Sequence, residues 1–206
     1  MTSTRANSAI DIASRALVLI GAEPITSFDS SSTEALVASN MYEDTVRAML
    51  STARWRFATE QQQLSLLANA PTGRYEYAYQ IPTSPQCLQI ISITENDINI
   101  QYARYGDKIF VDGHGSQSKL IMDYIFRQDE SEFPPYFRLA VEYKLASVFA
   151  GAIARDSAMV REFDNLAERQ ILIARNTESA ETTTKKLATD RFINERRSSR
   201  SGLVVG

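Results

Sequence analysis

The spacing of apolar residues changes twice along this sequence, and these two changes limit the fold more than any other feature. Before Trp55, apolar residues recur every three or four positions, as in amphipathic helices. Between Trp55 and residue 131, apolar and polar residues alternate in short runs separated by turn residues, as in antiparallel strands. Helical spacing returns after the Phe133-Pro134-Pro135 sequence, where proline suits the first turn of a helix. The sequence therefore predicts helices on both sides of a β insertion.

Two helices are expected before the insertion. The first covers residues 5–20 and ends at Gly21, which readily takes the left-handed conformation of a C-terminal cap. The second begins with a capping box, in which Ser31 and Glu34 would satisfy each other's backbone N–H groups, and continues to about Arg54. Each helix carries one apolar stripe, so we expect each to bury one face.

Two further helices are expected after the insertion. Residues 136–155 are apolar on nearly every side, which places this helix at the centre of the core. Residues 157–181 carry apolar residues on one face and charged residues on the other. Within the insertion, alternation and turn residues predict strands at 75–79, 88–93, 98–102, 109–111 and 119–126.

These patterns predict an α+β fold. Residues 1–54 and 132–182 are expected to form a four-helix bundle, and residues 55–131 an inserted antiparallel β-sheet or small barrel. Residues 183–206 lose all periodicity and are expected to form an extended, basic C-terminal arm. A chain of 206 residues is long enough to bury a core without disulfides or metals.

Charge is unevenly distributed along the chain. The net charge is −3, yet the arm at 183–206 carries six basic and only two acidic residues, so the remainder is acidic. An acidic body is not typical of a general nucleic-acid-binding protein. The sequence contains no apolar run of about 18 residues that would cross a membrane, and no apolar core typical of a signal peptide. We therefore expect synthesis in a cytoplasm and no membrane contact.

Patterns that would indicate catalysis or metal binding are sparse. One histidine, His114, and one cysteine, Cys87, do not supply the ligands of a tetrahedral zinc site. Cys87 lies in an apolar run and is expected to be buried. The acidic groups at Glu43-Asp44 and at 129–132 lie on a helix surface and before a helix start, where they complement the helix dipole. Phosphate-binding loops and nucleophile elbows are absent from the sequence, so we predict no enzymatic activity, cofactor or metal.

The C-terminal arm is the strongest candidate for contact with a partner. It mixes basic and apolar residues on a segment that cannot build a core alone, and such segments often become ordered on binding. The alternative is a terminus without a partner. The candidate contact residues are Arg191, Phe192, Ile193, Arg196, Arg197, Arg200, Leu203, Val204 and Val205.

A group of tyrosines in the insertion is a second candidate surface. Tyrosines can stack on nucleic-acid bases, but only Arg74 and Arg104 flank them here, and base-stacking sites need dense positive charge. Packing within the sheet or contact with a protein is therefore favoured. The candidates are Tyr75, Tyr77, Tyr79, Tyr102 and Tyr105.

Several motifs occur in an order that resembles one protein family. They are the run at 16–25, Trp55-Arg56-Phe57-Ala58, Tyr77-Ala78-Tyr79-Gln80-Ile81-Pro82, Gly106-Asp107-Lys108-Ile109 and Phe133-Pro134-Pro135-Tyr136-Phe137. Together they resemble the tail tubular protein A family, the ring-forming head-to-tail adaptors of short-tailed phages. Each motif alone is a small packing motif, so the resemblance depends on their joint order over residues 5–182.

The resemblance implies a structural protein of the virion tail, assembled in the bacterial host cytoplasm as a ring of about twelve copies. Such a ring joins the portal protein to the tail nozzle and surrounds a channel through which DNA passes without specific binding. The resemblance also implies that the arm docks on the portal and that the tyrosine-bearing β region faces the nozzle or a tail fibre. Two alternatives remain: a tail-associated peptidoglycan-degrading enzyme, and a nucleic-acid-associated module that uses the basic tail.

Overall fold

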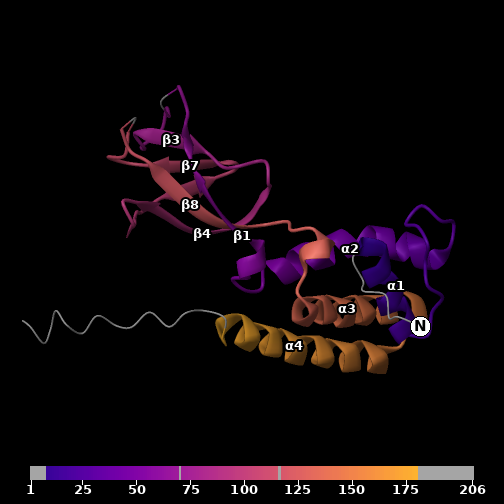
Figure 1. Ribbon diagram of the computed structural model, residues 1–206. Coiled ribbons are helices and arrows are strands. Elements are labelled where there is room, and N and C mark those ends of the chain that lie inside the picture. Colours follow the sequence, from indigo (N-terminus) through magenta and orange to yellow (C-terminus); the bar gives the residue numbers. More distant parts are fainter. Residues whose placement is uncertain (1–7, 70, 116, 181–206) are drawn as a thin grey trace, which may run out of the picture.

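The computed structural model describes residues 8–69, 71–115 and 117–180, which form two adjoining parts (Figure 1). Within these residues, the helical part contains four α-helices and the β part contains two antiparallel four-stranded sheets. The predicted combination of helices with antiparallel strands is therefore confirmed. The arm expected at 183–206 lies outside the described residues.

The first two helices, α1 (Ala9–Leu19) and α2 (Thr33–Leu50), each begin after a serine cap. In α2 the hydroxyl of Ser32 accepts a hydrogen bond from Ala35 N–H at 3.1 Å. The predicted capping box is therefore wrong by one residue, because Ser32 takes the role expected of Ser31. The periodicity of the sequence located both helices, but the residue that caps the second depends on where the preceding loop enters it.

The third helix, α3 (Pro135–Phe149), continues into the π-helix η3 (Ala150–Ala154) and is followed by α4 (Ser157–Ala180). After Pro135, every residue of α3 is buried or half-buried, and α3 contacts α1, α2 and α4. The prediction that this helix is central is confirmed. Its predicted regular course beyond Phe149 is wrong, because the chain widens into the π-helix, which ends at Arg155 in the left-handed conformation (φ 53°).

The β part is built from two sheets with strand orders β1-β8-β4-β5 and β2-β3-β7-β6. All pairings are antiparallel, and β4 shifts register against β8 at two points. The strands are β1 (Thr59–Gln63), β2 (Ser65–Leu66), β3 (Tyr77–Gln80), β4 (Cys87–Glu95), β5 (Ile98–Asn99), β6 (Ala103–Tyr105), β7 (Lys108–Val111) and β8 (Leu120–Phe126).

The two sheets enclose a hydrophobic core of their own. Its buried residues come from both sheets and include Tyr79 of β3, Ile93 of β4, Ile109 of β7 and Met122 of β8. The strands expected in the sequence are present, but the expected strand at 98–102 is wrong in length, because only Ile98–Asn99 forms a strand, β5, and β6 begins at Ala103. Period-two alternation predicts which side chains share a face, and it does not show how strands distribute between sheets.

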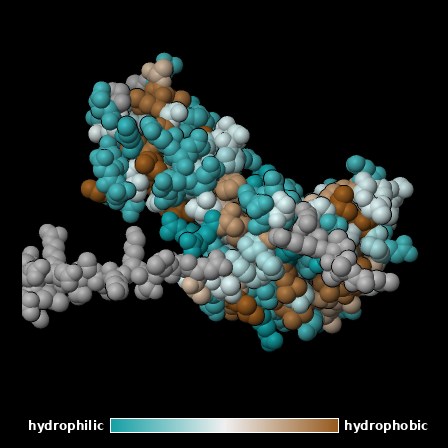
Figure 2. Space-filling view, viewed as in Figure 1, coloured by the Kyte–Doolittle hydropathy of each residue, from teal (hydrophilic) through white to brown (hydrophobic). Residues whose placement is uncertain are grey.

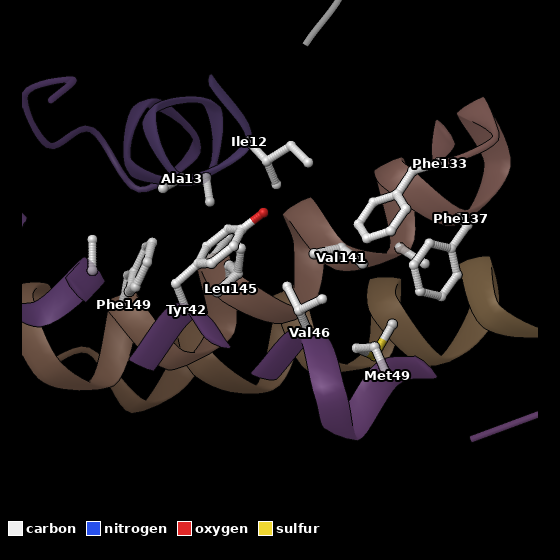
Figure 3. Packing of buried hydrophobic residues seen from close by; sticks show 14 of the residues in the cluster. Ile12, Ala13, Tyr42, Val46, Met49, Phe133, Phe137, Val141, Leu145 and Phe149 are labelled. Carbon is white, nitrogen blue, oxygen red and sulfur yellow. The ribbon is translucent and has the colours of Figure 1, made fainter. Parts of the chain in front are cut away.

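An aromatic cluster joins the two parts where the chain enters and leaves the β insertion. The Trp55 ring is fully buried and lies 5.0 Å from the Phe137 ring, and its Nε1–H donates to the Met49 carbonyl at 3.2 Å. Phe57 and Phe133 lie 6.0 Å apart and both contact Phe137. Figure 3 shows Phe133 and Phe137 beside each other, at one end of the core formed by α1, α2 and α3.

This cluster also changes the local structure from what the sequence predicts. Strand-like backbone is expected from Trp55 onward, but a short 3-10 helix, η1 (Arg56–Ala58), precedes β1. Helix α2 ends at Leu50 and not near Arg54, because the chain must turn back to place the Trp55 ring against the helix end. Burial of the indole therefore outweighs the local helical pattern.

We expect replacement of Trp55 by alanine to lower the free energy of unfolding by roughly 3–5 kcal/mol, because the change removes a fully buried indole and leaves a cavity. Urea titration followed by circular dichroism measures this loss. The matched control is Leu36→Ala at an exposed helical position (62% exposed), where we expect a change within about 0.5 kcal/mol. Equal losses in the two variants would contradict a central role for Trp55.

Candidate partner-binding surfaces

A groove of about 820 Å³ lies on the outer face of the β2-β3-β7-β6 sheet. Its floor includes Ala78 and Phe110, which are direct cross-strand neighbours on β3 and β7. Residues 67–69 and 71–75 form one side, and Tyr105 and Lys108 lie along the other. Small Ala78 leaves the space above the strands open, and the loop between β2 and β3 closes it from the side.

An arginine and three aromatic rings form the centre of this groove. The Tyr75, Tyr105 and Phe110 rings lie 5.6–6.3 Å apart at tilted or edge-on angles. Arg74 Nη2 donates to the hydroxyls of Tyr75 at 3.0 Å and Tyr105 at 3.3 Å, and its guanidinium lies 5.0 Å from the centre of the Tyr75 ring. The hydrogen bond from Arg74 also lowers the pKa of the exposed Tyr105 hydroxyl.

The structure separates the five candidate tyrosines. Tyr75 and Tyr105 meet in the groove, and Tyr102 is exposed outside this ring cluster. Tyr79 is only 1% exposed, because its ring belongs to the core between the sheets and its hydroxyl donates to the His114 carbonyl at 2.8 Å. Tyr77 is half-buried against the same core.

Sequence reasoning noted Arg74 beside the tyrosines without making it a candidate, and it missed other residues that line the groove, Lys108 and Phe110 among them. The signal for Arg74 is its position directly before Tyr75 in a glycine-containing loop. Phe110 and Lys108 become neighbours of these residues only through the pairing of β7 with β3 and β6. The nine candidate residues of the arm, Arg191 to Val205, lie outside the described residues.

The two acidic groups noted in the sequence converge on one arginine at the junction of the two parts. The Arg127 Nη2 lies 3.0 Å from Glu43 Oε2 and 2.5 Å from Glu130 Oε1. Tyr42 donates its hydroxyl proton to Glu130 Oε1 at 3.1 Å, and Arg47 also pairs with Glu43. Burial alone raises the pKa of Glu43, but hydrogen bonds from Arg127 and Arg47 lower it overall. These carboxylates are therefore held as ion-pair partners.

The other chemically distinctive residues have structural environments. His114 Nδ1 lies 2.6 Å from Glu95 Oε2, and hydrogen bonds from Ser118 and then His114 lower the pKa of Glu95. Cys87 is half-buried, and burial raises the pKa of its thiol, which makes the nucleophilic thiolate scarcer. Across residues 8–69, 71–115 and 117–180, no group of three histidine, cysteine or acidic side chains could hold a metal ion.

The helical part presents two further hollows with different charge. A groove of about 430 Å³ between α2 and α4 has an apolar floor and a rim with three acidic residues, Asp44, Asp164 and Glu168, against Lys144. A crevice of about 380 Å³ between α1 and α3 is lined by apolar residues that include the exposed Val18, together with the ion pair of Arg15 and Glu142. Figure 2 shows that hydrophobic residues interrupt the hydrophilic surface of both parts on the face displayed.

Comparison with known proteins agrees with the order of the motifs and with this mixed fold. The model of the tail tubular protein family matches residues 9–187, which include every described helix and strand. The chain belongs to the tail tubular protein family. No curated protein matches it at a significant level. As a tail tubular protein, the chain is a structural component of a phage tail, and in the described part no helix is both long and apolar enough to cross a membrane.

We expect Arg127→Met in this tail tubular protein to lower the free energy of unfolding at pH 7 by roughly 1–3 kcal/mol, since the partly buried carboxylates lose their shared cation. The pKa of Glu43 lies below its ordinary 4.5 in the folded state, so its contribution is complete above that pH and is lost as pH falls through the lowered pKa. The difference between wild type and variant should therefore narrow below about pH 4.5.

Urea titrations at a series of pH values measure this difference. Arg47→Met is the matched control, because it removes a cation that pairs with the same Glu43 on one helix surface. Such a surface pair contributes about 0.3–0.5 kcal/mol. A loss in Arg127→Met no larger than that of the control would show that the junction does not depend on Arg127.

Proposed function

We propose that the chain is an adaptor subunit of a phage head-to-tail connector, which forms a ring between the portal and the tail nozzle. The ring would surround the channel through which DNA leaves the head. The observation that carries this proposal is the family match over residues 9–187, the part of the chain that holds all of its described structure. The two-part architecture supports it, because separate parts offer separate surfaces to different partners (Figure 1).

Ring closure requires that one surface of a copy bind a different surface of the next copy. The α1–α3 crevice and the α2–α4 groove are two such surfaces, since they are formed by different pairs of helices. Acidic residues dominate the rim of the groove, whereas the crevice exposes apolar Val18 and Leu19 beside Arg15, which pairs with Glu142. We propose that these surfaces meet between neighbouring copies.

The remaining partners are assigned by position and charge. The described chain ends with α4 at Ala180, so the basic arm at 183–206 starts from the helical part, and we propose that it docks on the portal. The β part, with its groove at Tyr75 and Tyr105, would then face the nozzle or a fibre. The acidic body suits a channel for DNA, because like charge reduces adhesion to the phosphate backbone. The number of copies expected from the resemblance is about twelve.

Neither alternative function gains support from the site geometry. Peptidoglycan hydrolysis needs two carboxylates that face each other across an open cleft. Glu43 and Glu130 do approach each other, but Arg127 lies between them and binds both. A nucleic-acid-associated module would use the basic arm, and its affinity for nucleic acid would fall steeply as the salt concentration rises.

The adaptor function is tested by native mass measurement of the full chain and of a chain lacking residues 184–206, each with and without the purified portal ring. We expect the full chain to join the portal in about a dozen copies and the shortened chain to remain folded but unbound. The arm carries six basic residues against two acidic ones in an otherwise acidic chain, which is the physical reason for this expectation. Portal binding that persists without the arm would refute its docking role, and a full chain that ignores the portal would refute the adaptor function.

The contact between copies is tested by Val18→Glu. Val18 is 57% exposed, so we expect the fold to change in stability by no more than about 0.5 kcal/mol, whereas the new charge would be repelled by the acidic groove. We expect fewer copies on the portal, counted by native mass. Combining V18E with D44K and E168K should restore them, because the charges are then exchanged.

Leu36→Glu is the matched control for this experiment, since it places the same charge at an exposed position outside both hollows. We expect this variant to assemble as the wild type does. If V18E assembled normally, or if the exchanged charges did not restore the number of copies, the proposed pairing of crevice and groove would be wrong. Neither result would contradict the formation of a ring through other surfaces.

A further inference from the structure

We propose that the groove on the β2-β3-β7-β6 sheet binds an extended acidic segment of another tail protein. Apolar side chains of that segment would contact the floor at Phe110, and its carboxylates would pair with Arg74 and Lys108. The binding chemistry follows from the groove alone. Only the statement that the partner is a neighbouring tail protein depends on the proposed adaptor function.

The floor of the groove suits apolar side chains. Phe110 lies between Ala78 on β3 and Ala103 on β6 in the register of the sheet, so one large ring is flanked by two small residues. Pro71 and Leu67 of the adjacent loop add apolar surface to the side. Small residues beside a large ring leave depressions that can receive side chains from a partner, and burial of apolar surface stabilises such contacts.

The charge of the groove is opposite to that of the whole chain. Arg74 and Lys108 line it, whereas no aspartate or glutamate does, although the chain carries a net charge of −3. Among the ion pairs of the described residues, none involves Arg74 or Lys108. Within the described part of the chain, the hydrogen bonds of Arg74 go to the neutral hydroxyls of Tyr75 and Tyr105, which fix its position and leave its charge uncompensated. A guanidinium held in this way is preorganised for a carboxylate.

The backbone beside the groove favours an extended occupant. Strand β6 lies at the edge of its sheet and pairs only with β7, so the backbone groups on its other side are not used by the sheet. Tyr105 ends this strand and also lines the groove. An extended segment can therefore bond to the β6 edge while its side chains enter the groove, as in peptide recognition by strand addition.

A nucleic acid fits these observations less well than a peptide. The Tyr75, Tyr105 and Phe110 rings meet one another at angles of 44–67°, so they do not present parallel faces on which successive bases could stack. The two cations of the groove, Arg74 and Lys108, can pair with a few carboxylates but cannot neutralise the continuous charge of a nucleic-acid backbone.

The test measures fluorescence anisotropy of a labelled octapeptide that alternates leucine with glutamate, titrated with the full chain at low salt. A peptide that alternates leucine with lysine and a short oligothymidine are titrated in parallel. We expect the acidic peptide to bind the wild type more tightly than the other two probes. The variant R74E/K108E should weaken acidic-peptide binding by about tenfold or more and should prefer the lysine peptide.

The matched control is K119E/R169E, which makes the same change in net charge at two exposed cations that neither line the groove nor lie on β6. Binding that falls equally in both variants would reveal a general charge effect and overturn the proposal. An acidic peptide that does not bind, or an oligothymidine that binds as tightly as the peptide, would also overturn it. None of these results bears on portal binding, so the adaptor function is judged separately by native mass.

Discussion

Burial of the Trp55 indole is the interaction on which the rest of the structure depends. The β insertion leaves the helical part at Trp55 and returns to it at Phe133, so these two points must lie together for α3 to complete the helical core. The rings of Trp55, Phe57, Phe133 and Phe137 meet there within 5.0–6.1 Å of their neighbours. One cluster thus closes the helical core and fixes both connections of the insertion.

The ion pairs at the junction limit the orientation of the β part relative to the helical part. Arg127 directly follows β8, and Glu130 lies in the segment that connects β8 to α3. Glu43 belongs to α2. A guanidinium that binds two carboxylates allows few orientations, unlike apolar contact, which tolerates sliding. On the other side, Glu178 of α4 accepts a hydrogen bond from the Arg56 N–H at 2.5 Å. Contacts on two sides of the junction therefore oppose rotation of the β part about its connections.

The sequence predicted those features that depend on the pattern of neighbouring residues, and it did not predict those that depend on contacts between distant segments. The apolar residues of α3 predict a central helix, because only a core can accept apolar side chains on every face. The capping serine of α2 and the 3-10 helix after Trp55 were mispredicted, since tertiary packing decides the course of the chain there. The groove combines Arg74, Lys108 and Phe110 from separate segments, and only strand register brings them together.

The distribution of charge over the two parts of the molecule affects which partner each groove attracts. The acidic rim of the α2–α4 groove and the basic groove of the β part lie on different parts of one molecule. A basic segment is attracted to the first and repelled by the second, and an acidic segment has the opposite preference. Because the junction fixes the two parts relative to each other, a partner held in one groove also has a defined orientation toward a partner held in the other. The charge of each groove and the contacts at the junction together would let a single small subunit order several partners.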